Sequence, residues 1–188
     1  MDNDRVEKLI RELIIEIGED PTREGLKDTP KRIASAYKEI FAGYDSDSEL
    51  SVQFSEDAET VLIRDIQFYS MCEHHMLPFY GKIMLAYSPN GRVFGISKLV
   101  RLVEKYSRRL QIQERMTKNI ADELYSHGVK GVAVITEAEH LCMKMRGVRN
   151  DAFVTSAAFR GIFEKKEDKE SIIQIIKNPS PSSFTQNS

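Results

Sequence analysis

The sequence contains no apolar run that approaches the length of a membrane-spanning helix, which needs about 20 residues. The chain of 188 residues begins Met-Asp-Asn-Asp-Arg, and no apolar stretch with a cleavage site follows this charged start. We therefore expect no signal peptide and no contact with a membrane. A cytoplasmic location is the corresponding expectation.

An excess of charge of one sign is also lacking. The chain has 27 basic and 29 acidic residues, and its formal net charge at pH 7 is −2. Such a balance predicts no general attraction to nucleic acid or to anionic lipid. An anionic ligand would therefore need a local cluster of basic side chains.

Cysteine is scarce, with two residues in the whole chain. Two cysteines are too few for a disulfide framework in a chain of this length. Hydrophobic residues make up 41% of the sequence, which is enough for one ordinary core. The composition therefore predicts one domain, to which a helical extension can be added.

The N-terminal part of the sequence has two helical patterns. Residues 4–17 carry apolar side chains at spacings of three and four. Asp28-Thr29-Pro30 combines a capping side chain with a proline, which predicts a second helix that runs to about Phe41. Residues 44–58 are acidic and rich in serine, as is typical of a linker. We predict an N-terminal helical extension over residues 1–45.

The rest of the sequence mixes strand and helix patterns, so the predicted class is α+β. Helical spacing over 97–127 predicts one helix or a pair of helices. Asn90-Gly91 predicts a tight hairpin turn. We place a core domain at 59–177 and a disordered tail at 178–188. The predicted strands are 61–69, 82–87, 92–96, 130–137, 139–146 and about 152–163.

The residues with metal-binding side chains are clustered. Three of the four histidines and both cysteines fall in Cys72-Glu73-His74-His75 and His140-Leu141-Cys142. Thiolate and imidazole are the natural ligands of zinc, and a gap of two residues lets Cys72 and His75 reach one ion from a single turn. The sequence therefore predicts a Zn²⁺ site.

The second cluster lies on the predicted strand 139–146. Alternate side chains of a strand share a face. His140, Cys142, Lys144 and Arg146 would then lie on one polar face, with Leu141 and two methionines on the other. We expect the polar face to line a site and the apolar face to pack.

The number of ligands separates a catalytic from a structural zinc site. Structural sites usually have four protein ligands, whereas catalytic sites keep a position for water, whose pKa the metal lowers from about 15.7 to about 7. Cys72, His75 and Cys142 supply three ligands, and His74 and His140 remain as neighbours that can move protons near neutral pH. The alternative is a closed structural site that includes His74 or His140.

Two further segments carry polar groups of possible interest. Lys98 and Arg101 lie three apart at the start of a predicted helix, where free N–H groups and the helix dipole favour an anion such as phosphate. Gln113 and Glu114 offer an amide and a carboxylate that could pair with the edge of a purine. Taken alone, each segment is more simply interpreted as an exposed polar face of a helix.

Taken together, these segments resemble the GTP cyclohydrolase I family. The N-terminal motifs are Gly18-Glu19-Asp20-Pro21, Arg23-Glu24-Gly25-Leu26 and Thr29-Pro30-Lys31-Arg32. The later motifs are Cys72-Glu73-His74-His75, Pro78-Phe79, Gly95-Ile96-Ser97-Lys98, Arg108-Arg109-Leu110-Gln111-Ile112-Gln113-Glu114-Arg115, and His140-Leu141-Cys142-Met143 followed by Arg146-Gly147. They occur in the family's order from about residue 6 to 163.

The resemblance implies a hydrolase that opens the guanine imidazole ring of GTP at C8. The products would be formate and 7,8-dihydroneopterin triphosphate, in the first step of tetrahydrofolate and pterin biosynthesis. Cys72, His75 and Cys142 would bind zinc. His140 and His74 would handle protons, and Ser97 would lie near the ribose.

The same resemblance implies how GTP is held. Gln113 and Glu114 would bind the guanine edge. The residues implied for the triphosphate are Lys98, Arg101 and Arg146, with Arg32 of another subunit as a further candidate.

The resemblance also implies the tunnelling fold, in which an antiparallel sheet and paired helices from each subunit form a ring. Two pentameric rings would stack into a decameric homo-oligomer with active sites at subunit interfaces. Oligomerisation would supply the enclosed volume that a single chain of this size lacks for a nucleoside triphosphate.

Two other functions remain open at this point. A reductase of the same fold that acts on a 7-deazaguanine would need a nucleophilic cysteine and a nicotinamide cofactor. A non-catalytic, zinc-stabilised binding or regulatory protein would need no turnover at all. Both cysteines lie in zinc-like settings, which argues against the reductase.

Overall fold

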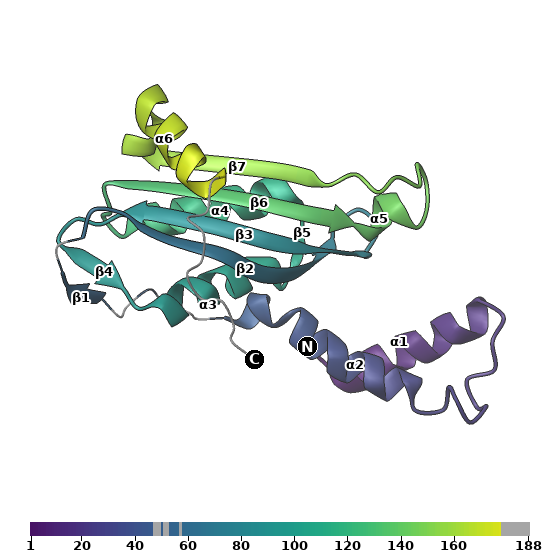
Figure 1. The fold of residues 1–188 in the computed structure, drawn as a ribbon. Helices are drawn as coiled ribbons and strands as arrows, with labels where there is room; N and C mark the ends of the chain where they lie inside the picture. Colours follow the sequence, from purple (N-terminus) through teal and green to yellow (C-terminus); the bar gives the residue numbers. More distant parts are fainter. Residues whose placement is uncertain (47–49, 51–52, 57, 178–188) are drawn as a thin grey trace, which may run out of the picture.

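The computed structural model describes residues 1–46, 50, 53–56 and 58–177, which form a mixed arrangement of helices and sheet (Figure 1). The α+β class is confirmed. The predicted tail at 178–188 and parts of the predicted linker at 44–58 lie outside the described residues. Within the described part of the chain, no helix has the length and apolar character needed to cross a membrane.

The body of the protein is a five-stranded sheet in the order β5-β2-β3-β6-β7. The bounds are β2 Val61–Cys72, β3 Pro78–Ser88, β5 Leu110–Gln111, β6 Gly131–His140 and β7 Val154–Gly161. Neighbouring strands are antiparallel, except that β5 is parallel to β2. A separate two-stranded sheet pairs β1 (Gln53–Ser55) with β4 (Arg92–Phe94).

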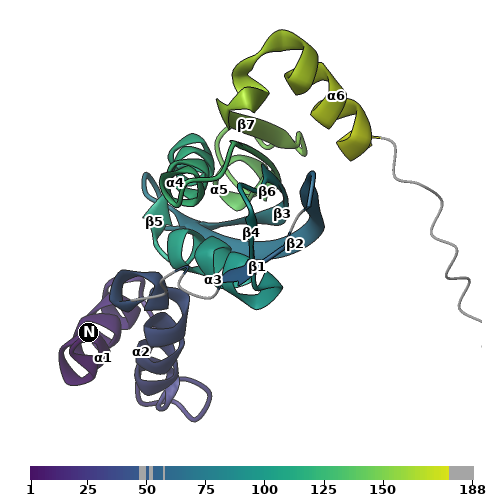
Figure 2. The same cartoon turned by 90° about the vertical axis from the view of Figure 1, so that its left-hand side faces the viewer.

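Two helices, α3 (Ile96–Ser107) and α4 (Gln113–Ser126), cover one face of the sheet (Figure 2). Their apolar sides meet those of β2, β3 and β6 in the main core, which contains Phe79, Ile83 and Leu102. The short strand β5 separates the helices, so the predicted pair of helices over 97–127 is confirmed.

The other face is covered at one end by η2 (Ile162–Glu164) and α6 (Lys166–Lys177). Phe163, Ile172 and Ile176 bury apolar side chains there in a second, smaller core. Arg64 of β2 donates a hydrogen bond to the carbonyl oxygen of Ile175, near the C-terminal end of α6. A cationic side chain at this end of a helix satisfies a free carbonyl group.

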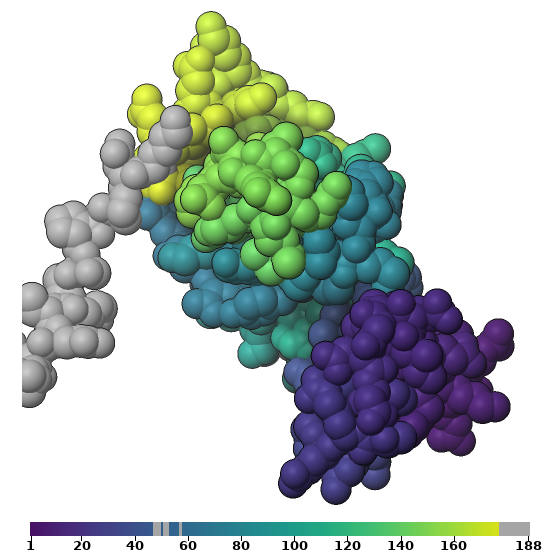
Figure 3. Space-filling view, turned by 90° about the vertical axis from the view of Figure 1, so that its right-hand side faces the viewer, coloured from purple at the N-terminus to yellow at the C-terminus, as the bar shows by residue number. Residues whose placement is uncertain are grey.

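The helices α1 (Asn3–Glu16) and α2 (Thr29–Ile40) pack against each other and project from the body (Figure 3). Both predicted N-terminal helices are confirmed. The 3₁₀ helix η1 (Ala42–Asp45) connects them to the body, where Arg109 donates to the carbonyl oxygen of Gly43 at 2.6 and 3.0 Å. The domain boundary at residue 45 stays a prediction.

The hairpin predicted at Asn90-Gly91 is wrong. Gly91 adopts a positive φ of 75°, as a tight turn requires, but β4 pairs with β1 and not with β3. Both edges of β3 are already hydrogen-bonded, to β2 and to β6. The strand after the turn therefore has no free edge on β3.

The strand predicted at 139–146 is also wrong. Strand β6 ends at His140, and residues Leu141–Lys144 form a short helix, α5. His140 is paired with Phe79, so the next position would face Pro78, which lacks the N–H group that a ladder needs. On its other side β7 begins at Val154, opposite Ala138. The chain loses its strand partners on both sides at this point and turns.

Strand β2 contains a β-bulge. Ile63 pairs with Leu85 and Ile66 pairs with Ile83, so two residues of β2 stand opposite one residue of β3. Asp65, in the bulge, has a positive φ of 55° and an ion pair with Lys82 at 2.9 Å. An extra residue reverses which side chains face the core.

Gly81 of β3 is a position where the backbones approach too closely for a side chain. An added Cβ would lie 1.9 Å from the carbonyl oxygen of Glu137 on β6. We expect Gly81→Ala to lower the free energy of unfolding by about 1–3 kcal/mol or more, as forced overpacking does. Calorimetry should then show a fall in melting temperature of about 2–4 °C per kcal/mol.

The control is Gly25→Ala, where the added Cβ meets only the flexible guanidinium of Arg23, at 3.2 Å. This variant should melt close to the unmodified protein. Equal melting temperatures for the two variants would contradict the close approach of β3 and β6.

Candidate metal centre

The turn between β2 and β3 carries the first cluster of candidate ligands. Cys72 is the last residue of β2, and its carbonyl oxygen accepts a hydrogen bond from the N–H of Met76 at 2.8 Å. The N–H of Cys72 donates to the carbonyl oxygen of Leu77 at 2.9 Å, and Met76 has a positive φ of 51°. This tight turn places His74 and His75 on the surface beside the buried Cys72.

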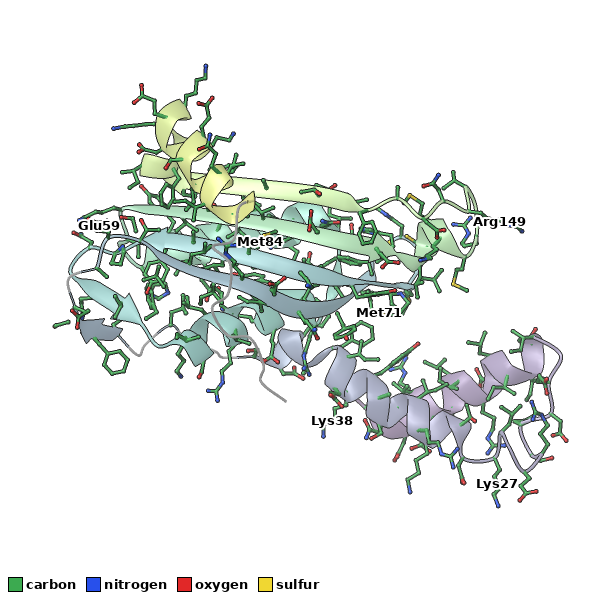
Figure 4. The ribbon with its side chains drawn as sticks, viewed as in Figure 1. Lys27, Lys38, Glu59, Met71, Met84 and Arg149 are labelled. Carbon is green, nitrogen blue, oxygen red and sulfur yellow. The ribbon has the colours of Figure 1, made fainter. Side chains whose placement is uncertain are left out.

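The second cluster reaches the same place from the end of β6. His140 is the last residue of that strand, and the chain then enters α5, which contains Cys142. Figure 4 marks this end of the sheet by Met71, next to Cys72, and by Arg149 in the loop that follows α5. The two clusters, about 70 residues apart in sequence, meet because β3 lies between β2 and β6.

Among the described residues, one group has the donor set of a metal site. One ligand atom each from Cys72, His75 and Cys142 lies within 4.8 Å of the other two. Two sulfurs bound to one tetrahedral zinc at about 2.3 Å are roughly 3.8 Å apart, so small side-chain movements would bring this group onto an ion. Two thiols and an imidazole also match zinc in softness. The residues therefore fit a zinc ion.

His74 and His140 lie outside this group of three. The Nδ1 atoms of His74 and His75 are both 3.9 Å from the sulfur of Cys72, but only His75 is also close to Cys142. A site with three protein ligands is typical of catalytic zinc. The geometry thus favours the catalytic alternative over a closed structural site.

The electrostatics of Cys142 are consistent with a cation. Burial raises the pKa of its thiol, and the neighbouring sulfur of Cys72 raises it further. Two thiolates at such short range repel each other, and a dication between them reverses this penalty. Arg146 acts in the opposite direction and lowers the pKa of Cys142, which places its charge near the site.

The imidazole ring of His140 is held by a stacking contact on one face and by a hydrogen bond at one edge. Its ring stacks on the buried ring of Phe79, with centroids 4.7 Å apart and planes 3° from parallel. Its Nε2 lies 2.8 Å from Oε1 of Gln113. Burial lowers the pKa of His140, and the carboxylate of Glu114 partly opposes this. At pH 7 the imidazole is therefore largely neutral.

An ion pair connects the metal-binding turn to α4. Arg115 donates to both carboxylate oxygens of Glu73, at 2.5 and 3.1 Å. The Arg115 guanidinium lowers the pKa of this carboxyl. The N–H of Glu73 also donates to the carbonyl oxygen of Gln111, at 3.1 Å. The turn that carries His74 and His75 is thus tied to the start of α4.

The two residues predicted to bind guanine lie side by side in sequence but face different surroundings. The side chain of Gln113 is 1% exposed and bonded within the core. Glu114 is exposed and lines an open hollow of about 590 Å³ between α4 and β7, together with Lys118 and Ser156. Only the carboxylate is available to a ligand without rearrangement.

Ser97, Lys98 and Arg101 lie away from the metal group of their own chain. They are at the start of α3, which follows β4 at the opposite end of the sheet (Figure 1). The helix has 12 residues, which corresponds to about 18 Å. A single chain does not bring these candidate phosphate contacts to Cys72 and Cys142.

The remaining candidates are exposed. Arg146 follows α5 at the metal end of the sheet. Arg32 lies on the projecting arm and forms an exposed ion pair with Asp28 at 3.7 Å. Lys144, which the wrong strand would have placed beside Cys142 on the polar face, instead pairs with Glu139 at 2.7 Å and Asp151 at 3.3 Å.

Several neighbours of the site had no role in the sequence interpretation. Phe79, Glu73 and Arg115 are all within the quoted motifs, so the motifs could have pointed to them. Thr136 is different: it bonds to the Gln113 amide, but a threonine within a strand gives no signal because it is an ordinary β-former.

Comparison with solved structures gives a chain described as an archaeosine synthase QueF-Like in the apo form. It has a TM-score of 0.48 and 16% identity, and the match covers 56% of this chain and 97% of that one.

Sequence comparison gives much stronger matches. A GTP cyclohydrolase 1 from Hyperthermus butylicus is 52% identical over 179 residues, which is 94% of this chain and 92% of that protein. A GTP cyclohydrolase 1 from Clostridium kluyveri is 50% identical over 183 residues, covering 94% and 99%. The model of the GTP cyclohydrolase I family matches residues 6–177. In this chain, two thiols and an imidazole meet beside a neutral histidine at one end of the sheet. The sequence matches show that the chain is an enzyme of the GTP cyclohydrolase I family.

Proposed function

We propose that this chain hydrolyses the guanine imidazole ring of GTP at C8, with zinc as cofactor. The C8 carbon leaves as formate, and the rearranged ribose closes a new ring to give 7,8-dihydroneopterin triphosphate. One water is consumed overall, because the ring closure returns one of the two waters used in hydrolysis. The observation that carries this proposal is the Cys72–His75–Cys142 group with His140 at the same end of the sheet.

The cofactor and the protein groups would divide the chemistry between them. When bound, zinc supplies a Lewis acid that makes water nucleophilic near neutral pH. Cys72, His75 and Cys142 would be its ligands. The neutral imidazole of His140 can take up a proton and return it to a ring nitrogen, since burial lowers its pKa. His74, exposed on the turn, would be a second group for proton transfer.

Substrate binding follows from charge and position. The exposed carboxylate of Glu114 can accept hydrogen bonds from the N–H groups of the guanine edge, with Gln113 beside it at the start of α4. We propose Lys98, Arg101 and Arg146 for the triphosphate and Ser97 for the ribose. Arg32, on the projecting arm, is a further candidate for a phosphate contact from another subunit.

We propose that the active site is shared between subunits. The start of α3 is about one helix length from the metal end of the sheet, so another chain would have to bring Ser97 and its basic neighbours to that end. A ring-shaped tunnelling-fold oligomer, a decamer of two stacked pentamers, would achieve this. The expected cytoplasmic location, and a place at the start of pterin and tetrahydrofolate biosynthesis, belong to the same proposal.

The direct test is turnover of GTP by zinc-loaded protein. Formate should be released in a one-to-one ratio with a pterin that becomes fluorescent after oxidation, and about one zinc should be bound per chain. Absence of both products from folded, zinc-loaded protein would reject the proposed reaction. Oxidation of NADPH with a 7-deazaguanine would favour the reductase instead.

Cys142→Ser should lose metal and activity together. A hydroxyl is a poor substitute for thiolate on zinc, so we expect zinc affinity to fall by more than about 100-fold, the upper range for the loss of an outer-shell partner. Metal analysis after dialysis, together with the turnover assay, measures this. Met143→Leu, which conserves volume at the next position, is the control. Retention of zinc by the serine variant would contradict the ligand assignment.

His140→Ala should retain zinc and most of its affinity for GTP while turnover falls roughly 10²–10⁴-fold, the range for loss of a general acid–base group. The separate measurements are zinc content, equilibrium GTP binding and kcat. Stoichiometric loss of zinc from this variant would instead show that His140 is a fourth zinc ligand, which leaves no position for water.

A further inference from the structure

A buried polar cluster lies in the layer between α4 and the sheet. Gln113, Thr117 and Thr136 have exposed fractions of 1%, 1% and 0%. The neighbouring residues Met116 and Ile120 on α4 are also fully buried and apolar. Methionine or valine could fill the polar positions without any need for hydrogen bonds, since buried polar groups cost free energy unless they are paired. The cluster therefore calls for a reason other than packing.

The hydrogen bonds of Gln113 fix the orientation of its amide. Its Nε2 lies 2.9 Å from the carbonyl oxygen of Val154 and 3.0 Å from both the carbonyl oxygen and Oγ1 of Thr136. Carbonyl oxygens only accept, so the opposite orientation would place Oε1 against two acceptors. The amide nitrogen must face β6 and β7, and Oε1 must face His140.

The orientation of the Gln113 amide also determines which nitrogen of His140 carries a proton. Oε1 of Gln113 can only accept, and it lies 2.8 Å from Nε2 of His140. Nε2 must therefore carry the hydrogen. In the neutral imidazole the free lone pair is then on Nδ1.

The two threonines complete a closed ring of hydrogen bonds. Thr117 Oγ1 donates to the carbonyl oxygen of Gln113 at 2.7 Å. Its single proton is thereby used, so in the 2.8 Å contact between the hydroxyls Thr136 is the donor. Thr136 Oγ1 in turn accepts from Nε2 of Gln113 at 3.0 Å. The two protons of Gln113 Nε2 are shared among three acceptors, and the carbonyl oxygen of Ser156 lies 3.5 Å from Thr136 Oγ1 as a longer alternative. Every polar group of the ring thus has a partner, which makes the amide rigid.

We propose that Gln113 is a positioning residue that holds the imidazole of His140 in its Nε2–H form, leaving Nδ1 to exchange protons with the substrate. Phe79 fixes the plane of the ring and Gln113 fixes its edge. This role rests on the proposed function, and it replaces direct contact of the Gln113 side chain with guanine. The threonine pair and the carbonyl oxygen of Val154 keep the amide in place.

The first test is Gln113→Met, which retains the length of the side chain but cannot accept from His140. We expect kcat to fall roughly 10- to 100-fold, the range for loss of an oriented outer partner. KM, the equilibrium affinity for GTP, zinc content and oligomeric state should remain unchanged. A rise in KM and a loss of GTP affinity with kcat intact would show that Gln113 contacts the substrate, and would overturn the proposal.

The second test asks whether Gln113 acts through His140. If it does, the double variant Gln113→Met, His140→Ala should have nearly the same kcat as His140→Ala alone, because the imidazole that Gln113 positions is already missing. A kcat of the double variant that is lower by the product of the two single-variant factors would overturn the proposal. If the methionine variant folds poorly, the tautomer of His140 in the unmodified protein, measured by ¹⁵N NMR as described below, decides the matter.

The control is Ser88→Ala, which removes another buried hydroxyl hydrogen bond. Ser88 Oγ donates to the carbonyl oxygen of Glu59 at 3.1 Å, at the opposite end of the sheet (Figure 4). This variant should keep the kcat of the unmodified protein. An equal fall in kcat would reduce the effect at Gln113 to general destabilisation and overturn the proposal.

The tautomer is also measured directly, without turnover. Zinc-loaded protein labelled with ¹⁵N at histidine should show His140 with its proton on Nε2, and the His140→Ala spectrum identifies the signal. Gln113→Met should lose this preference. A proton on Nδ1 in the unmodified protein would overturn the proposal, whereas inactivity toward GTP with the Nε2–H form present would reject only the proposed reaction.

Discussion

The site depends on the hydrogen-bonded ladders that β3 makes on its two edges. The ladder to β2 ends at the pair Met71 and Pro78, and the ladder to β6 ends at the pair Phe79 and His140. Both neighbouring strands therefore leave the sheet at the same end. Cys72 and Cys142 meet there only because these registers coincide, and a shift of one residue in either ladder would separate them.

Metal binding and proton transfer have separate supports at this end of the sheet. Cys72 ends β2, whereas His75 lies on the following turn and Cys142 on a short helix, where small movements can bring these two onto an ion. His140 instead lies at the end of a strand, stacked on Phe79 and bonded to a buried amide. A rigid mount suits a group that must meet a reacting atom at one distance and angle, because misplacement of about 1 Å is costly in catalysis.

Sequence patterns predicted the elements whose signals are local, and failed where the partner strand decided. Apolar spacing predicted the first N-terminal helix and Pro30 the start of the second, although the side chain of Asp28 makes no capping hydrogen bond there. The ligand types in Cys72–His75 and His140–Cys142 predicted the donor group that the fold brings together. The hairpin at Asn90-Gly91 failed because β3 had no free edge. The strand at 139–146 failed because alternation along a sequence carries no information on Pro78, which would lie opposite Leu141. The polar ring at Gln113 joins three distant segments, which no local pattern predicts.

The bulge at Arg64 and Asp65 has a consequence for insertions and deletions in β2. Before the bulge, Val61 and Ile63 pack on the core beneath the helices; after it, Ile66, Phe68 and Cys72 do so. The residues of β2 that face this core therefore have odd numbers before the bulge and even numbers after it. A chain with one residue fewer in the bulge would pair regularly with β3, yet it would turn either the first apolar residues or the Cys72 sulfur to the opposite side of the sheet. The number of residues in β2 is thus constrained more tightly than the identity of the residues in the bulge.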